Sequence, residues 1–314
     1  MGKPQQKPNS RILLPDQRPF RDGTDISLLM ELVGKMPLSA RQVIDLPRRL
    51  GTPGIHEGSN AVLWLDDDGR AVAFAAWQFS WAVLDFFILP GLQQHAVADD
   101  LFVWADERFR ALDQERGKPL PYWVTFRDDD VERHQLVKEH GFLFGESDCY
   151  VLLQHPLQDI LPTPVLPAGF TLRSLAGVRE TSAYAELHRA AFESTSMTAD
   201  WRARVIGMPQ YRSELDLVIV APDGTLVGFC VGWFSPEHQV AQIEPFGVHP
   251  RFQRLGLGRV LLLEILRRFQ VQGATNAFVE TNIERSSARG AYQAVGFQQI
   301  HTIRHIGKWM VRSV

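Results

Sequence analysis

The chain has 314 residues, enough for two ordinary domains, and its two cysteines are too few for a disulfide framework. Its formal net charge of −3 gives no electrostatic basis for binding nucleic acid. No apolar run has the length of a membrane helix, and the polar start contains no signal-peptide core. We therefore expect a cytoplasmic protein that begins with a mobile tail over residues 1–17.

The first half, residues 18–158, alternates short apolar runs with amphipathic ones. The run at 83–89 is continuously apolar, as in a strand that is buried on both faces. Gly117 and Gly141 are typical of the residue that follows a helix. We expect strands at 61–65, 71–79, 83–89, 122–126 and 149–154, and helices at 25–33, at 99–116 and from the acidic cap at 128–130 to His140.

A proline-rich stretch separates the two halves. Residues 159–168 include Pro162, Pro164 and Pro167, which favour a stiff, extended linker. The second domain, residues 169–314, then repeats the order of the first. We expect strands at 170–172, 217–221, 226–234, 240–248, 276–281 and 299–311, and helices at 180–192, 259–272 and 284–295.

Landmarks in the first half have counterparts in the second. The turn Asp68–Gly69 corresponds to Asp223–Gly224, and Gly141–Phe142 corresponds to Gly296–Phe297. A nearly constant spacing over these and other landmarks predicts an internal repeat. We therefore predict an α+β fold of two tandem domains, each with a mixed, mostly antiparallel sheet flanked by helices.

The most informative stretch is the loop that runs from Gln253 to Gly258. It joins a predicted strand to a predicted helix, and its two glycines leave backbone N–H groups free to face an anion at the helix start. Arg251, Arg254 and Arg259 add positive charge around it. These features favour a phosphate or pyrophosphate site, with a plain structural turn as the alternative.

Two other phosphate-binding loops fit this stretch less well. A dinucleotide loop needs a third glycine where Leu261 stands, although Glu280 lies at a suitable distance for a ribose. A Walker A loop needs Gly-Lys followed by Ser or Thr, which is missing here.

The pattern Val248-His249-Pro250, followed by Gln253-x-x-Gly256-x-Gly258, resembles the acetyl-CoA signature of the GCN5-related N-acetyltransferases, or GNATs. The later run from Ala288 through Tyr292 to Gly296-Phe297 is similar to another motif of that family. The resemblance is strong over about residues 169–314 and weak over 18–155. Two such domains in one chain resemble the tandem subgroup that includes mycothiol synthase.

The resemblance implies that acetyl-CoA donates an acetyl group directly to an amine, without a covalent enzyme intermediate. Pantetheine would lie between the strand ending at Val248 and the strand ending at Thr281, with a backbone N–H near Gly247 or Val248 as donor to the thioester carbonyl. Tyr292 would protonate the departing thiolate. The predicted cofactor-binding residues are Phe246, Gly247, Val248, Gln253, Arg254, Leu255, Gly256, Leu257, Gly258, Arg259, Asn282 and Arg289.

The general base is predicted to be Glu244, a carboxylate on the strand beside the slot. Pro245 follows it and cannot donate to a ladder, which predicts a bulge or an edge strand here. Some family members place a catalytic Glu two residues earlier, where this chain has Gln242. His249, His238 and water therefore stay open as alternatives, and Asn282 either binds pantetheine or only forms a turn.

The first half carries a degraded copy of these motifs. Ala96 and Ala98 replace the loop glycines, Asp99 and Asp100 follow where positive charge is needed, and Val137 stands at the tyrosine position. We expect this half to bind no CoA and to supply one wall of the acceptor cleft.

The partners expected are acetyl-CoA and a small amine, with no metal, nucleic acid or membrane. A non-catalytic acyl-CoA-binding module and a purely structural protein are the alternative functions. The sequence carries no code for the acceptor or for the oligomeric state.

Overall fold

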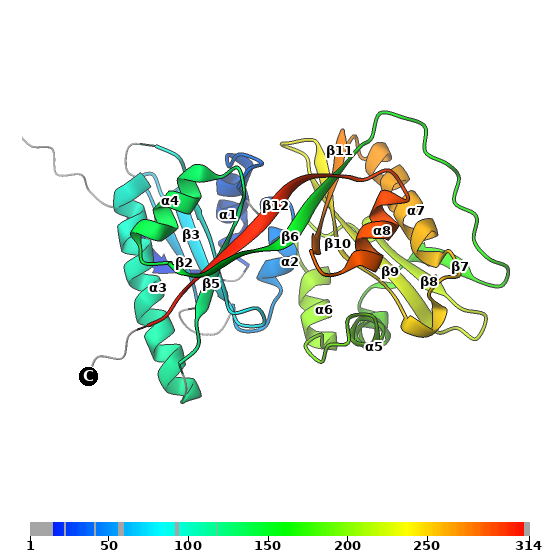
Figure 1. Ribbon diagram of the computed structural model, residues 1–314, viewed down its shortest axis with the longest axis horizontal. Helices are drawn as coiled ribbons and strands as arrows, with labels where there is room; N and C mark the ends of the chain where they lie inside the picture. The colour runs from blue at the N-terminus through cyan, green and yellow to red at the C-terminus, as the bar shows by residue number, and fades with distance from the viewer. Residues whose placement is uncertain are drawn as a thin grey trace, which may run out of the picture.

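One mixed sheet runs through both halves of the chain in the computed structural model, which describes residues 15–21, 23–40, 42–55, 60–91, 94–117 and 119–310. In this part of the chain the sheet has twelve strands, in the order β1-β2-β3-β4-β5-β12-β6-β11-β10-β9-β8-β7. Helices cover both faces (Figure 1). None of the described helices combines the length and the apolar character needed to cross a bilayer.

The N-terminal half places two helices on each face of its five strands. Apolar side chains of α3 and α4 form one core against the sheet, and those of α1 and α2 form another on the opposite face. Its elements are β1 (Asp16–Pro19), α1 (Ile26–Gly34), α2 (Leu46–Leu50), β2 (Ala61–Leu65), β3 (Ala71–Gln78), β4 (Val83–Ile88), α3 (Gln94–Arg116), β5 (Tyr122–Arg127) and α4 (Val131–Glu139).

The C-terminal half has the same plan. Side chains of α7 and α8 fill the core on one face, and those of α5 and α6 fill the core on the other. Its elements are β7 (Thr171–Ser174), α5 (Thr181–Phe192), α6 (Ala199–Ile206), β8 (Asp216–Val220), β9 (Leu226–Ser235), β10 (Val240–Val248), α7 (Leu257–Val271), β11 (Asn276–Asn282) and α8 (Ser286–Gln293), with 3₁₀ turns at Gly177–Glu180, Ser213–Leu215 and Pro250–Phe252.

Strand pairing confirms the predicted α+β fold with two tandem units. Pairing is antiparallel along each half except for one parallel pair, β4 with β5 in the first and β10 with β11 in the second. The two halves therefore follow one topology, read inward from opposite edges of the sheet.

The two halves exchange their last strands, which the sequence did not indicate. β6 (Phe144–Pro156) pairs with β11, and β12 (Gln298–Lys308) pairs with β5. β6 and β12 also pair with each other, and they cross the middle of the molecule side by side (Figure 1). The domain boundaries at 18–158 and 169–314 stay a prediction, because the last strand of each half lies in the sheet of the other half.

Most predicted strands and helices are confirmed to within a few residues, with three additions. β1, α2 and α6 were not predicted, because each is short. α6 is stabilised by Thr198, whose hydroxyl accepts a hydrogen bond from the Trp201 backbone N–H at 3.1 Å. Of the predicted tail, Asp16 and Gln17 belong to β1, and residues 1–14 lie outside the described residues.

The strand exchange predicts that neither half folds well alone. A fragment of residues 159–314 lacks β6, so β11 would become an exposed edge and the core under α7 would lose Val151 and Leu153. We expect this fragment to be insoluble when expressed alone and to become soluble when residues 1–158 are co-expressed. Soluble yield and circular dichroism melting measure this, and cooperative melting of the isolated fragment would contradict it.

Candidate active site

The strands β10 and β11 separate halfway along their length. They pair in parallel from Val240 opposite Asn276 to Ile243 opposite Val279, and no further pairs follow in the described residues. Beyond that point β10 stays on β9 as far as Val248, while β11 stays on β6 as far as Asn282. The two strand ends thus diverge and leave a slot between them, where the sequence analysis predicted one.

A bulge in β10 lies at the start of this divergence. The register against β9 shifts between Ile243 and Phe246, so Glu244 and Pro245 fall outside the ladder, and the peptide bond between them is cis. Pro245 has no N–H to give to a neighbouring strand. The predicted bulge is confirmed, whereas the alternative of an edge strand is wrong, because β10 lies between β9 and β11.

A cavity of about 340 Å³ opens where the slot meets the N-terminal half. Both candidate catalytic side chains, Glu244 and Tyr292, line it. Its walls come from both halves and combine charged with aromatic groups. The N-terminal half contributes Asp45, Arg48, Arg49, Trp81, Val83, Thr125 and Tyr150, and the C-terminal half contributes, among others, His188, Phe192, Trp201, Gln242, Glu280, Thr281, Asn282 and Arg285.

The start of α7 lies beside the end of β10, and no side chain of the described residues caps it. Gly256 is the N-cap residue, with φ at +80°, and Arg254 also has a positive φ, of +63°. The backbone N–H groups of Leu257, Gly258 and Arg259 have no hydrogen-bond partner among the described residues. Three free donors at the positive end of a helix dipole form a site for an anion.

The two loop glycines are needed for different reasons. The backbone of Gly256 is left-handed, although the space around it is open. A Cβ on Gly258 would lie 3.2 Å from the ring of Phe246, so glycine lets α7 start close to β10. Leu255 between them is about half exposed, and the Gln253 side chain donates to the Val248 carbonyl at 3.3 Å.

Two of the predicted cofactor-binding side chains, those of Arg259 and Asn282, are held by local contacts on the α8 side. Arg259 donates to the carbonyl of Ala294 at the end of α8, at 2.7 Å. Asn282 Oδ1 accepts from the backbone N–H of Glu284 at 2.8 Å, which is the turn-forming role considered above, while Asn282 also lines the cavity. Arg289 lies half-buried on α8. Their roles toward a cofactor stay predictions.

Tyr292 is buried on α8 with its ring against Phe246 and Phe297, at centroid distances of 5.5 and 5.8 Å. Its hydroxyl makes no hydrogen bond within the described residues, and the residue lines the cavity. Burial raises the pKa of Tyr292 well above its usual value, and the nearby Glu244 raises it further. The phenol therefore keeps its proton at neutral pH and is available as a donor.

Glu244 faces the same cavity and contacts a cation from the other half. Its Oε1 lies 3.4 Å from Nη2 of Arg48 on α2. Burial raises the pKa of Glu244, and the charge of Arg48 opposes that rise. A carboxyl group with a raised pKa is better matched to proton transfer near neutral pH than an exposed one.

The alternative bases lie elsewhere. His238 is held by Ser235 at 2.9 Å and by the carbonyl of Met36 at 3.0 Å, and His249 accepts from the backbone of Arg251. Neither lines the cavity. His188, which was not predicted, does line it, but burial and then Arg48 lower its pKa to about 3.

Comparison with known proteins supports the same family. Residues 181–297 match the model of the acetyltransferase (GNAT) family. Mycothiol acetyltransferase from Paenarthrobacter aurescens is 30% identical over 290 residues, which cover 84% of each chain. The chain belongs to the GNAT family of acetyltransferases.

Four other relatives are matched over less of their length. Mycothiol acetyltransferase from Thermomonospora curvata is 30% identical over 194 residues, 60% of this chain and 63% of that protein. The chain spans 48% to 63% of the length of this and three further mycothiol acetyltransferases.

The tandem GNAT protein from the clavulanic acid biosynthesis pathway has a TM-score of 0.65 at 14% identity, over 95% of this chain and 99% of that one, which shows a shared fold.

In the first GNAT unit, the segment that corresponds to this loop is helical and carries two aspartates. α3 begins at Gln94, five residues before the predicted start, because Ala96 and Ala98 continue the helix where the second unit has glycines. Asp100 accepts a hydrogen bond from the indole N–H of Trp64 at 2.6 Å, and Asp99 lies 3.0 Å from His140. Residues 92–93 lie outside the described residues, and the absence of CoA binding here stays a prediction.

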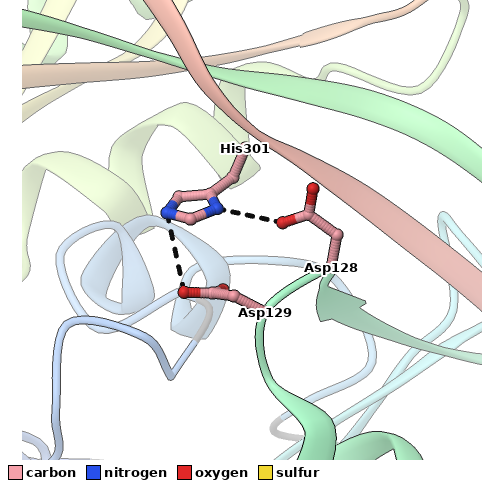
Figure 2. Close-up of side chains that lie close together, drawn as sticks. All are labelled: Asp128, Asp129 and His301. Atoms are coloured by element: carbon pink, nitrogen blue, oxygen red, sulfur yellow. Dashed lines mark hydrogen bonds and ion pairs between the residues drawn. The ribbon is translucent and has the colours of Figure 1, made fainter.

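A cluster of Asp128, Asp129 and His301 lies on the surface where β12 passes β5 (Figure 2). His301 Nδ1 is 2.9 Å from Asp128, and His301 Nε2 is 3.6 Å from Asp129. Arg127 pairs with Asp129 at 2.6 Å and lies 2.9 Å from His301 Nε2. The positive charge beside these side chains is therefore supplied by the Arg127 guanidinium. Sequence reasoning missed this cluster because only the strand exchange brings residue 301 beside 128.

Proposed function

We propose that this chain transfers an acetyl group from acetyl-CoA to a primary amine of a small molecule, in the C-terminal GNAT unit. The main support is that Glu244 and Tyr292 line one cavity, at the mouth of the slot between β10 and β11. From this slot, β10 leads to the uncapped start of α7. This arrangement supplies a proton acceptor, a proton donor and an anion site in the order that a thioester of a long phosphorylated carrier needs.

The residues fit such a carrier. The three free N–H groups at the start of α7 and the nearby arginines suit a diphosphate, and the slot between β10 and β11 suits the pantetheine arm. Acetyl-CoA supplies a thioester that an amine can attack. As the amine nitrogen bonds to the acetyl carbon, Glu244 takes an amine proton, the carbon–sulfur bond breaks, and Tyr292 gives its proton to the sulfur.

The acceptor is proposed to be small, because the cavity of about 340 Å³ is near the lower end of small-molecule sites. The relatives named mycothiol acetyltransferase make the mycothiol class the first to include in an amine screen. A non-catalytic acyl-CoA-binding module is the alternative function. It has no need of a buried tyrosine hydroxyl and a carboxylate that face one cavity.

Acetyl-CoA should raise the melting temperature of the protein, because it binds only the folded state. At a concentration of about 100 Kd the stabilisation is about 2.7 kcal/mol, which corresponds to several degrees. Gly256→Glu and Gly258→Asp should each abolish the shift, by charge and by blocking the approach to the loop. Gly224→Glu is the control, since Gly224 has a similar φ of +86° and open surroundings in a distant turn. A full shift in the loop variants would contradict the site.

The two proposed catalytic groups should affect turnover rather than binding. Tyr292→Phe and Glu244→Gln should each lower kcat by about 10²-fold or more, since positioned acids and bases typically contribute that much. The melting shift with acetyl-CoA should stay near that of the wild type in both. Steady-state rates on the best amine of a screen measure the first effect. Equal losses of turnover and of acetyl-CoA affinity would instead mean that these side chains are structural.

A further inference from the structure

The N-terminal half reaches the cavity through α2, which is pressed against the C-terminal half. A Cβ on Gly51, at the end of α2, would lie 2.6 Å from the side chain of Val205 on α6. Arg204 of α6 also donates to the carbonyl of Gly51 at 3.2 Å. Leu46 and Leu50 are fully buried in their own half. These contacts hold α2 in a defined place beside the cavity.

Two neighbouring arginines on α2 line the cavity but have different partners. Arg49 is buried, and its Nη1 lies 2.9 Å from the fully buried Asp85, an ion pair within the N-terminal half. Within the residues that the structure describes, Arg48 has no partner at such a short distance. Its Nη2 lies 3.4 Å from Asp45 and 3.4 Å from Glu244, and its Nε is buried without a hydrogen bond to any described residue.

The position of Arg48 is fixed by packing. The carbon of its guanidinium lies 5.2 Å from the centroid of the Trp81 ring, and Trp81 packs edge to face on Trp201 of the other half at 6.1 Å. Only 12% of the Arg48 side chain is exposed. With 25% of the Glu244 side chain exposed, the charge of Arg48 is held close to the proposed base in a setting where solvent screens it only in part.

The charged and titratable groups around Glu244 come from several elements. Arg48 favours its ionised form most strongly, and Arg49 adds to this from the same helix. Asp45 before α2 and Glu280 on β11 act in the opposite direction. Tyr292 on α8 and Tyr184 on α5 are neutral phenols, and His188 on α5 is neutral as well. Arg48 is therefore the main source of positive charge for this carboxylate.

We propose that Arg48 is a positioning residue supplied by the N-terminal half, which holds the Glu244 carboxylate toward the cavity in its charged form. This inference rests on the proposed function, since it assigns a role toward the proposed base. It gives the half without a CoA site a part in the reaction that goes beyond forming a wall.

The test is Arg48→Met, which keeps much of the side-chain length and removes the charge. An opposite charge at this range lowers the pKa of a carboxyl group by about 1 to 3 units. Loss of the Arg48 charge should move the acidic limb of the kcat/KM profile to a higher pH by about 1 pH unit or more. At pH values below that limb, kcat/KM should fall about tenfold or more. Activity at high pH should largely recover. Arg48→Lys should lie between this variant and the wild type.

Arg204→Met is the matched control, because it removes an arginine contact across the same junction without touching Glu244. It should leave the acidic limb in place. In a Glu244→Gln background, Arg48→Met should cause no further shift of the profile. The acetyl-CoA melting shift should persist in every variant, which separates this effect from a loss of fold.

A titration of Glu244 by ¹³C NMR reads the same quantity without turnover, so it decides the inference even where no acceptor is acetylated. A rise in the Glu244 pKa of about 1 unit or more in Arg48→Met supports the proposal. An unchanged pKa, or an unchanged acidic limb in an active Arg48→Met enzyme, overturns it. Wild-type protein that acetylates no amine would count against the proposed function alone.

Discussion

The exchange of β6 and β12 is the constraint on which the rest of the structure depends. Each strand pairs with the sheet of the opposite half, so the edge of β5 is covered by β12 and the edge of β11 by β6. An uncovered inner edge would leave a row of unpaired N–H and C=O groups. The exchange therefore ties two units of one fold into one sheet and sets how α2 of the first half lies against the second.

That arrangement makes the candidate site a product of both halves. The C-terminal unit provides the diverging strands, the bulge at Glu244 and Pro245, and the open start of α7. The N-terminal unit provides α2 and Trp81, which close the cavity from the other side. A unit whose own loop has lost its glycines can thus stay under functional constraint through the charge and shape that it presents to its neighbour.

Local rules predicted much of the fold and of the site. Apolar periodicity located most helices and strands, and glycines marked the ends of helices. Pro245 predicted the bulge, because its missing N–H removes a hydrogen bond from the strand that contains it. The strand exchange, Arg48 and the Asp128–His301 pair were not predicted. Each depends on contacts between segments that are far apart in the sequence. Because both units have the same strand pattern, the sequence does not show whether a strand pairs within its own unit or with the other unit. α2 has only five residues, too few for a periodic signal.

We propose that CoA binds this chain at one site, the start of α7. A crystal structure of the protein with CoA would decide this. We expect the diphosphate on the free N–H groups of Leu257, Gly258 and Arg259, and the pantetheine arm between β10 and β11 with its sulfur near Tyr292. A diphosphate bound at the start of α3 instead, or a slot between β10 and β11 that stays empty at saturating CoA, would contradict it.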